Sequence, residues 1–230
     1  MGLSIGPNLA FKQGMKALFA IAIAISPCFA LTITPDGSIP ALHRSIDLSL
    51  DGISTSYYAG QIGVRFDNGS PALLFCADPL IWLRNEAVAV TAVPASSLSY
   101  GPRLAWLLQN YGSSLSSGPQ AAALQFAAWD VVLDAGDGFT AGRLQARSST
   151  DSAILALANT MLSASAGQAA SGVSFYIPLQ GASYSQTLFG FTSASALVVN
   201  ELPEPGTFLL LGGGLLLAGA WRRGGTVRSR

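Results

Sequence analysis

Hydrophobic and polar residues alternate along several stretches between residues 31 and 100, which is the pattern of half-buried β-strands. Residues 45–50 (SIDLSL) alternate, and residues 55–66 are rich in aromatic and β-branched side chains. The segment 72–77 (ALLFCA) follows a turn of sequence NGSP, and residues 86–93 (EAVAVTAV) end the series. The pattern predicts a succession of strands in this part of the chain.

The period of the hydrophobic pattern changes in the middle of the chain from that of a strand to that of a helix. Residues 102–112 have helical spacing and end in glycine, residues 118–138 open with a proline near the first turn, and residues 150–167 open with a Thr-Asp pair suited to capping. Strand patterns return at 172–179, 185–191 and 196–200. Residues 31–201 are therefore expected to form one α+β domain, an antiparallel sheet or sandwich that carries a helical insertion.

The N-terminal residues have the pattern of a secretory signal peptide. Lys16 precedes the apolar run 17–25, and the small residues Cys28 and Ala30 stand where a signal peptidase reads the chain. Residues 1–30 are therefore expected to be removed after Ala30, and Met15 is an alternative start to Met1. Acylation of Cys28 as a lipoprotein is disfavoured, because Pro27 stands where a small residue is required.

The C-terminal residues 202–230 combine three elements in a fixed order. Pro203, Glu204 and Pro205 precede an apolar run at 206–221, which is close to the ~20 residues that span a bilayer. Arg222 and Arg223 follow at once and hold that end of the helix in the cytoplasm, so the preceding domain lies outside.

This order resembles the PEP-CTERM sorting signal of Gram-negative bacteria. The resemblance implies that an exosortase recognises the signal and cleaves near Pro203-Glu204-Pro205. It also implies transient anchoring in the inner membrane, followed by delivery to the cell surface or to an extracellular polysaccharide matrix.

The composition agrees with export. Half of the residues are hydrophobic and only a tenth are charged, which suits an exported or membrane-tethered protein better than a cytosolic enzyme. Residues 31–203 contain six arginines, eleven acidic residues and no lysine, a net charge of −5. A mildly acidic body without a basic patch argues against nucleic acid as a partner.

Cys76 is the only cysteine left once residues 1–30 are removed, so no intramolecular disulfide is possible. A buried thiol in an apolar strand is one interpretation. A cysteine protease would need a base beside the thiol, and the chain's only histidine, His43, lies in a polar loop context. One cysteine and one histidine do not complete a zinc site, and no GxSxG motif is present, so we expect neither an enzyme nor a cofactor.

Gln125 is the second unusual residue. It lies in the stretch AALQFAAWDVVLD, whose spacing predicts an amphipathic helix with one buried stripe formed by Leu124, Ala128 and Val131. A neighbouring face of the same helix groups Gln125 with Ala121, Trp129 and Val132. The amide is therefore expected to lie beside the Trp129 indole.

The residues around Cys76 and Gln125 together resemble the thioester domains of bacterial surface adhesins. These domains carry an aromatic-Cys-hydrophobic motif on an early strand and a hydrophobic-Gln-x-Ala-hydrophobic-Trp motif on a later helix. Phe75-Cys76-Ala77 and residues 124–129 (LQFAAW) match both motifs in that order, and the resemblance covers roughly residues 71–166. Small Ala77 and Ala128 stand where bulkier apolar residues are usual.

The resemblance implies a thioester between Cys76 and Gln125, with Phe75 and Trp129 keeping water from the bond. It further implies covalent attachment to an amine or hydroxyl of a surface protein or polysaccharide. No lysine occurs after Lys16, so the chain has no internal ε-amine that could consume the bond.

One alternative function stays open: a structural envelope or matrix protein with the same sorting signal, in which Cys76 only fills the core. The segment 134–139 (DAGDGF) is read as the end of a helix and a turn, because it lacks the alternating ligands and terminal glutamate of an EF-hand. No metal site is therefore expected.

Overall fold

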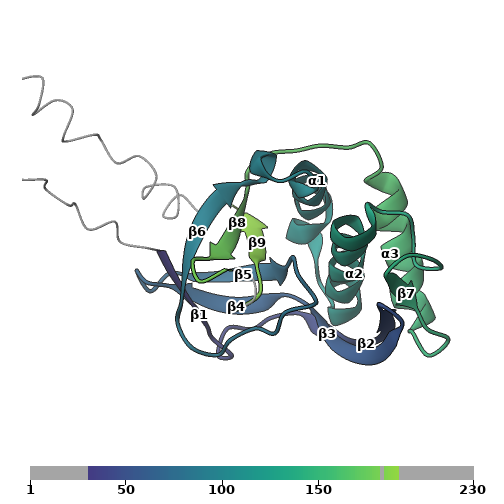
Figure 1. Ribbon diagram of the computed structural model, residues 1–230, viewed down its shortest axis with the longest axis horizontal. Coiled ribbons are helices and arrows are strands. Elements are labelled where there is room, and N and C mark those ends of the chain that lie inside the picture. The colour runs from purple at the N-terminus through teal and green to yellow at the C-terminus, as the bar shows by residue number, and fades with distance from the viewer. Residues whose placement is uncertain (1–30, 182–183, 192–230) are drawn as a thin grey trace, which may run out of the picture. The chain divides into compact units, whose positions relative to one another are not determined.

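The computed structural model describes residues 31–181 and 184–191 (Figure 1). The expected signal peptide, the expected strand at 196–200 and the C-terminal segment 202–230 lie outside these residues. Within the described ranges, no helix combines the length and the apolar character needed to cross a bilayer.

Six antiparallel strands close into a barrel (Figure 1). Around the barrel the order is β1 (Leu31–Pro35), β4 (Ile62–Phe66), β5 (Pro71–Cys76), β9 (Leu188–Phe191), β8 (Val173–Pro178) and β6 (Val88–Pro94). Closure pairs every strand on both sides and removes the exposed edges of an open sheet. Apolar side chains fill the interior, namely Leu31, Ile33, Val64, Phe66, Leu74, Val88, Val90, Tyr176 and Leu188.

A second, three-stranded sheet lies beside the helices. Its order is β3 (Ile53–Gly60), β2 (His43–Leu50) and β7 (Leu144–Ala146). Alternate residues of β2, namely Ile46, Leu48 and Leu50, are buried and join the larger hydrophobic core, which also contains the helices. The alternation seen in the sequence at 45–50 therefore corresponds to one buried and one more exposed face.

Helix α2 (Gly118–Asp134) occupies the centre of this larger core. It packs against α1 (Gly101–Tyr111) and α3 (Ser152–Ala164), and also against strands β2, β3, β5 and β7 (Figure 1). The Ser117 hydroxyl caps its start by accepting a hydrogen bond from the Gln120 N–H, and Ala135 ends it in the left-handed conformation with φ 57°. Short 3₁₀ turns at Ala95–Ser97 and Gly112–Ser114 flank α1.

The expected α+β class and the helical insertion between strands agree with this architecture, but the antiparallel strands form a closed barrel and a second small sheet where a sheet or sandwich was expected. The run 55–66 is also two strands in different sheets rather than one. The chain turns between them at Gly60, whose φ is +133°. A Cβ atom there would collide with the backbone oxygen of Leu42, so glycine is required at the crossing from the second sheet into the barrel.

The amphipathic character expected for the Gln125 helix is wrong. Every residue from Ala121 to Val131 is buried, so the expected stripe and the neighbouring face are covered, except at Val132, which is partly buried. Because α2 has helices on one side and a sheet on the other, it has no solvent face in this part. Gln125 is therefore a buried amide that needs hydrogen-bond partners.

Candidate functional site

The structure brings Cys76 and Gln125 together through two hydrogen bonds. The Cys76 backbone N–H donates to the Gln125 side-chain oxygen Oε1 at 2.9 Å. The Gln125 side-chain nitrogen Nε2 donates in return to the Cys76 backbone oxygen at 2.6 Å. Residues 49 positions apart in the chain are thus held side by side, and both polar atoms of the buried amide are satisfied.

The end of strand β4 explains why the amide fits here. Strand β4 pairs with β5 only as far as Ile62 opposite Leu74, two residues before Cys76. On the other side of β5, the Ala77 N–H still donates to the Thr187 oxygen, next to β9. Because consecutive residues of a strand point their N–H groups to opposite sides, the backbone N–H of Cys76 points to the side of β5 on which β4 lies, at a position beyond the end of β4. Gln125 occupies that place in the ladder.

The Cys76 thiol is buried, with 3% of the residue exposed. Burial raises its pKa to about 12, while the Trp129 indole and the Asp78 backbone N–H oppose that shift, and the Asp78 charge adds to it. The indole N–H of Trp129 approaches the sulfur without reaching ordinary hydrogen-bond geometry. The expected neighbourhood of the amide, the indole and the thiol is therefore present.

Tyr57 of strand β3 is part of this site, although the sequence analysis did not select it. Its ring meets Trp129 edge-on, with ring centres 5.7 Å apart, and stacks on Trp82 at 5.9 Å. Burial raises the pKa of Tyr57, and the nearby Cys76 thiol adds to the shift. Trp82 is 75% exposed, so three aromatic rings lead from solvent to the thiol. Only the packing of β3 on α2 reveals this, because no spacing in the sequence relates Tyr57 to Trp129.

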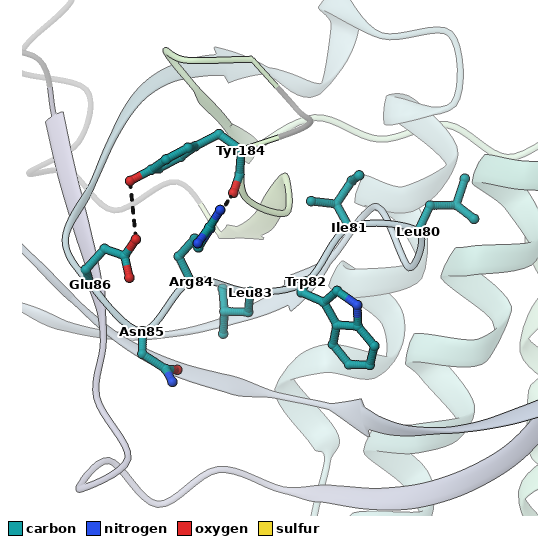
Figure 2. A pocket seen from close by; sticks show the side chains of 8 residues that line it. All are labelled: Leu80, Ile81, Trp82, Leu83, Arg84, Asn85, Glu86 and Tyr184. Carbon is teal, nitrogen blue, oxygen red and sulfur yellow. Dashed lines mark hydrogen bonds between the residues drawn. The ribbon is translucent and has the colours of Figure 1, made fainter.

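The loop that carries Trp82 is anchored at its far end (Figure 2). The Arg84 guanidinium donates to the Tyr184 backbone oxygen at 2.9 Å and lies over the Tyr184 ring, and the Tyr184 hydroxyl donates to Glu86 at 3.2 Å. Residues 80–86 and Tyr184 line a surface hollow of about 500 Å³. In Figure 2 the Trp82 indole points away from the Arg84 and Tyr184 contacts, and its ring stacks on Tyr57 of strand β3 instead.

Phe75 is buried in the same core, but its ring contacts Phe189 at 5.8 Å, and Phe189 in turn stacks on Phe175. These contacts place Phe75 in the packing between the barrel and the helices. Its expected part in keeping water from Cys76 stays a prediction. The His43 ring lies against Tyr58 and accounts for none of the shift in the pKa of the Cys76 thiol.

A free thiol at Cys76 should be slow to alkylate at neutral pH. A Gln125→Ala variant has no side-chain carbonyl for the thiol to attack, so its thiol stays free. Because the thiolate is the reactive form and the pKa is about 12, the rate of iodoacetamide labelling should rise about tenfold per pH unit from pH 7 to 10 without levelling. In denaturant, the labelling rate of the same variant should level off near the ordinary thiol pKa of 9.0. If the labelling rate of the folded variant also levels off near pH 9, the buried environment of the thiol is contradicted.

Comparison with known proteins identifies the C-terminal segment alone. Residues 201–223 match the family model described as the PEP-CTERM protein-sorting motif. No curated protein and no solved structure matches the chain. The match includes Pro203, Glu204 and Pro205, together with Arg222 and Arg223, and it supports the expectation of an exported protein that an exosortase processes.

Proposed function

We propose that this protein is an exported, exosortase-sorted surface or matrix protein, not an enzyme, whose domain forms a thioester between Cys76 and Gln125. The bond serves once, for covalent attachment to a partner that carries a nucleophile. The pair of hydrogen bonds between Gln125 and the Cys76 backbone is the observation that carries the proposal, because it holds the side-chain carbonyl beside the cysteine. The proposal rests on this geometry and not on a likeness of fold.

Bond formation needs no outside reagent. The Cys76 sulfur adds to the Gln125 side-chain carbon, the carbon–nitrogen bond breaks, and the nitrogen leaves as ammonia with the thiol proton. The product is a thioester, in which an activated acyl group is stored in the fold.

The backbone of Cys76 favours this step. Its N–H already donates to Oε1, so it would stabilise the negative charge that develops on this oxygen when the sulfur adds. Its carbonyl oxygen accepts from Nε2 and so holds the nitrogen that departs. The raised pKa of the thiol has the opposite effect, because little thiolate exists at neutral pH; the sulfur must lose its proton during the attack.

Once formed, the bond lies in a site from which water is excluded. Cys76, Gln125 and Trp129 are 3%, 1% and 2% exposed, respectively. A nucleophile from the partner would enter along the Trp82 and Tyr57 rings, which form the one part of this aromatic series that reaches solvent. An amine would form an amide with the acyl group and return a free thiol at Cys76.

A second candidate function is favoured by the same two hydrogen bonds. Gln125 would complete the ladder of β5 beyond the end of β4, and Cys76 would only fill the core of a structural envelope or matrix protein. In that case no covalent bond forms and the amide of Gln125 stays intact. The two functions therefore differ in chemistry and not in fold.

Methylamine labelling separates these functions. Exported protein treated with methylamine should carry one methylamide at position 125, and one thiol should be released at Cys76, as mapped on peptides. The structural function predicts neither product. Labelling at other glutamines, such as Gln120 on the same helix, would show a reaction unrelated to the proposed bond.

Trp129→Phe should keep the thioester but shorten its lifetime. The smaller ring leaves space beside the sulfur and loses the indole N–H, so water reaches the bond more easily. We expect hydrolysis to be about tenfold faster at neutral pH, followed by mass spectrometry as a gain of one water with time. Trp106→Phe on α1, where the ring packs on Tyr111, is the matched control and should leave the lifetime unchanged. Equal lifetimes in both variants would remove Trp129 from the shielding role.

A further inference from the structure

Three carboxylates meet where helix α2 ends. Asp130 and Asp134 belong to its last turns, and Asp137 lies in the loop that follows. One oxygen from each residue lies within 4.8 Å of the oxygens of the other two. Asp130, which helix α2 supplies, lies outside the segment 134–139 that was compared above with an EF-hand loop.

Asp130 is the unusual member of the cluster. It is completely buried, yet its oxygen Oδ1 has no hydrogen-bond partner among the described residues. The other oxygen, Oδ2, accepts only a long bond of 3.3 Å from the Gly138 N–H. A buried carboxylate with a free oxygen is costly, so this side chain calls for a cation or a proton.

No basic side chain of the described residues forms an ion pair with the cluster. The nearby Arg103 guanidinium donates to Ser165 Oγ, to the Ala135 oxygen and to the Leu162 oxygen. The Arg143 side chain pairs with Asp51, and the Asp134 carboxylate accepts hydrogen bonds from the backbone N–H groups of Arg143 and Leu144.

The pKa of Asp130 reflects this arrangement. Burial raises the pKa of Asp130 to about 6, and the charges of Asp137 and Asp134 add to this rise. The hydrogen bond from the Gly138 N–H and the charge of Arg103 lower the pKa in part. The negative charge of the cluster is thus only partly compensated by the protein.

We propose that Asp130, Asp134 and Asp137 bind one Ca²⁺ ion at the C-terminal end of helix α2. Carboxylate oxygens are the ligands that Ca²⁺ prefers. Two oxygens on opposite sides of a Ca²⁺ ion lie about 4.6–5.2 Å apart, and no pair of the cluster's oxygens is farther apart than 4.8 Å, so the three carboxylates are close enough to share one ion. The negative end of the helix dipole adds to the attraction.

Burial differs across the cluster in the way that a binding site requires. Asp130 is buried, Asp134 is intermediate and Asp137 is exposed, so the ion can enter from the Asp137 side and keep water ligands there. Because the ligands come from the helix and from the loop after it, the ion would hold the Asp137 loop against α2. This site lies outside the pair of Cys76 and Gln125, and its occupancy does not depend on the thioester.

Calcium binding is tested on the exported protein after its metal has been removed with EDTA. In isothermal titration with CaCl₂ we expect one site with a dissociation constant of about 10⁻⁴ to 10⁻³ M, as in extracellular calcium modules. At tenfold excess over that constant the melting temperature should rise by a few degrees. MgCl₂ at the same concentration should produce a smaller rise, because Mg²⁺ sheds its water reluctantly.

Asp137→Asn is the decisive variant, because the residue is exposed and its replacement leaves the core intact. It should weaken Ca²⁺ binding at least tenfold, whereas the exposed Asp67→Asn should bind as the wild type does. Asp130→Asn should melt higher than the wild type without Ca²⁺ and lose the Ca²⁺ response. Cys76→Ala should bind Ca²⁺ normally, so failure of the thioester would not affect this result. Absence of a response in the wild type, or an equal response in Asp137→Asn, would overturn the site.

Discussion

Cys76→Ala should abolish methylamine labelling at position 125 and restore the full mass of the chain. The effect is expected to be complete, because without the sulfur the Gln125 amide is an ordinary, unreactive side chain. The fold should persist, since both hydrogen bonds between the residues use only the backbone of Cys76. Labelling is measured by mass spectrometry after a fixed exposure to methylamine.

Two further variants define the control for this result. Gln125→Ala should also prevent labelling and leave a free thiol at Cys76, whereas Gln120→Ala on the same helix should label as the wild type does. Undiminished labelling at position 125 in Cys76→Ala would mean that the thiol takes no part in the reaction.

Replacing Pro203, Glu204 and Pro205 together with alanine should stop C-terminal processing. In a host with an exosortase, the wild type should lose a tag placed at its C-terminus. The triple variant should keep the tag and stay with the membrane fraction, because the apolar run 206–221 is then not removed. Immunoblots of membrane and secreted fractions measure both outcomes.

The control for sorting uses arginines outside the matched segment. Arg228→Gln with Arg230→Gln lies beyond residues 201–223 and should be processed normally. Loss of Arg222 and Arg223 should impair processing, since these residues belong to the match, and arginines after an apolar run are expected to stay on the cytoplasmic side. A wild-type chain that keeps its tag in such a host would contradict sorting by exosortase and leave only a membrane anchor.

Local patterns were sufficient to predict most elements of the fold. Strand alternation at 45–50 and the caps of the helices depend on neighbouring residues, and β2, α1, α2 and α3 lie close to their expected positions. Closure of the barrel was not predictable, because it depends on β9 pairing with β5 and on β8 pairing with β6 across long stretches of chain. Strand β7 was also missed, since its three residues are too short to show a period.

In the candidate site, too, some residues could be predicted from the sequence and others could not. Two motifs selected Cys76 and Gln125, and the structure places them in contact. Tyr57 could not be found from the sequence, because its position depends on how β3 packs on α2. Asp130 was not predicted for a related reason. A carboxylate in an apolar helix is expected to face solvent, and only the packing on both sides of α2 shows that Asp130 is buried.

The intact mass of the freshly purified exported protein tests the central claim most directly. If the thioester forms, the chain is lighter than its sequence by one ammonia, and the peptide map contains no intact amide at Gln125. A chain that has lost the bond to water carries a glutamate side chain at position 125, which the same map resolves. Full sequence mass with an intact Gln125 amide and a free thiol at Cys76 would contradict the thioester and leave Gln125 as a hydrogen-bonding partner of strand β5.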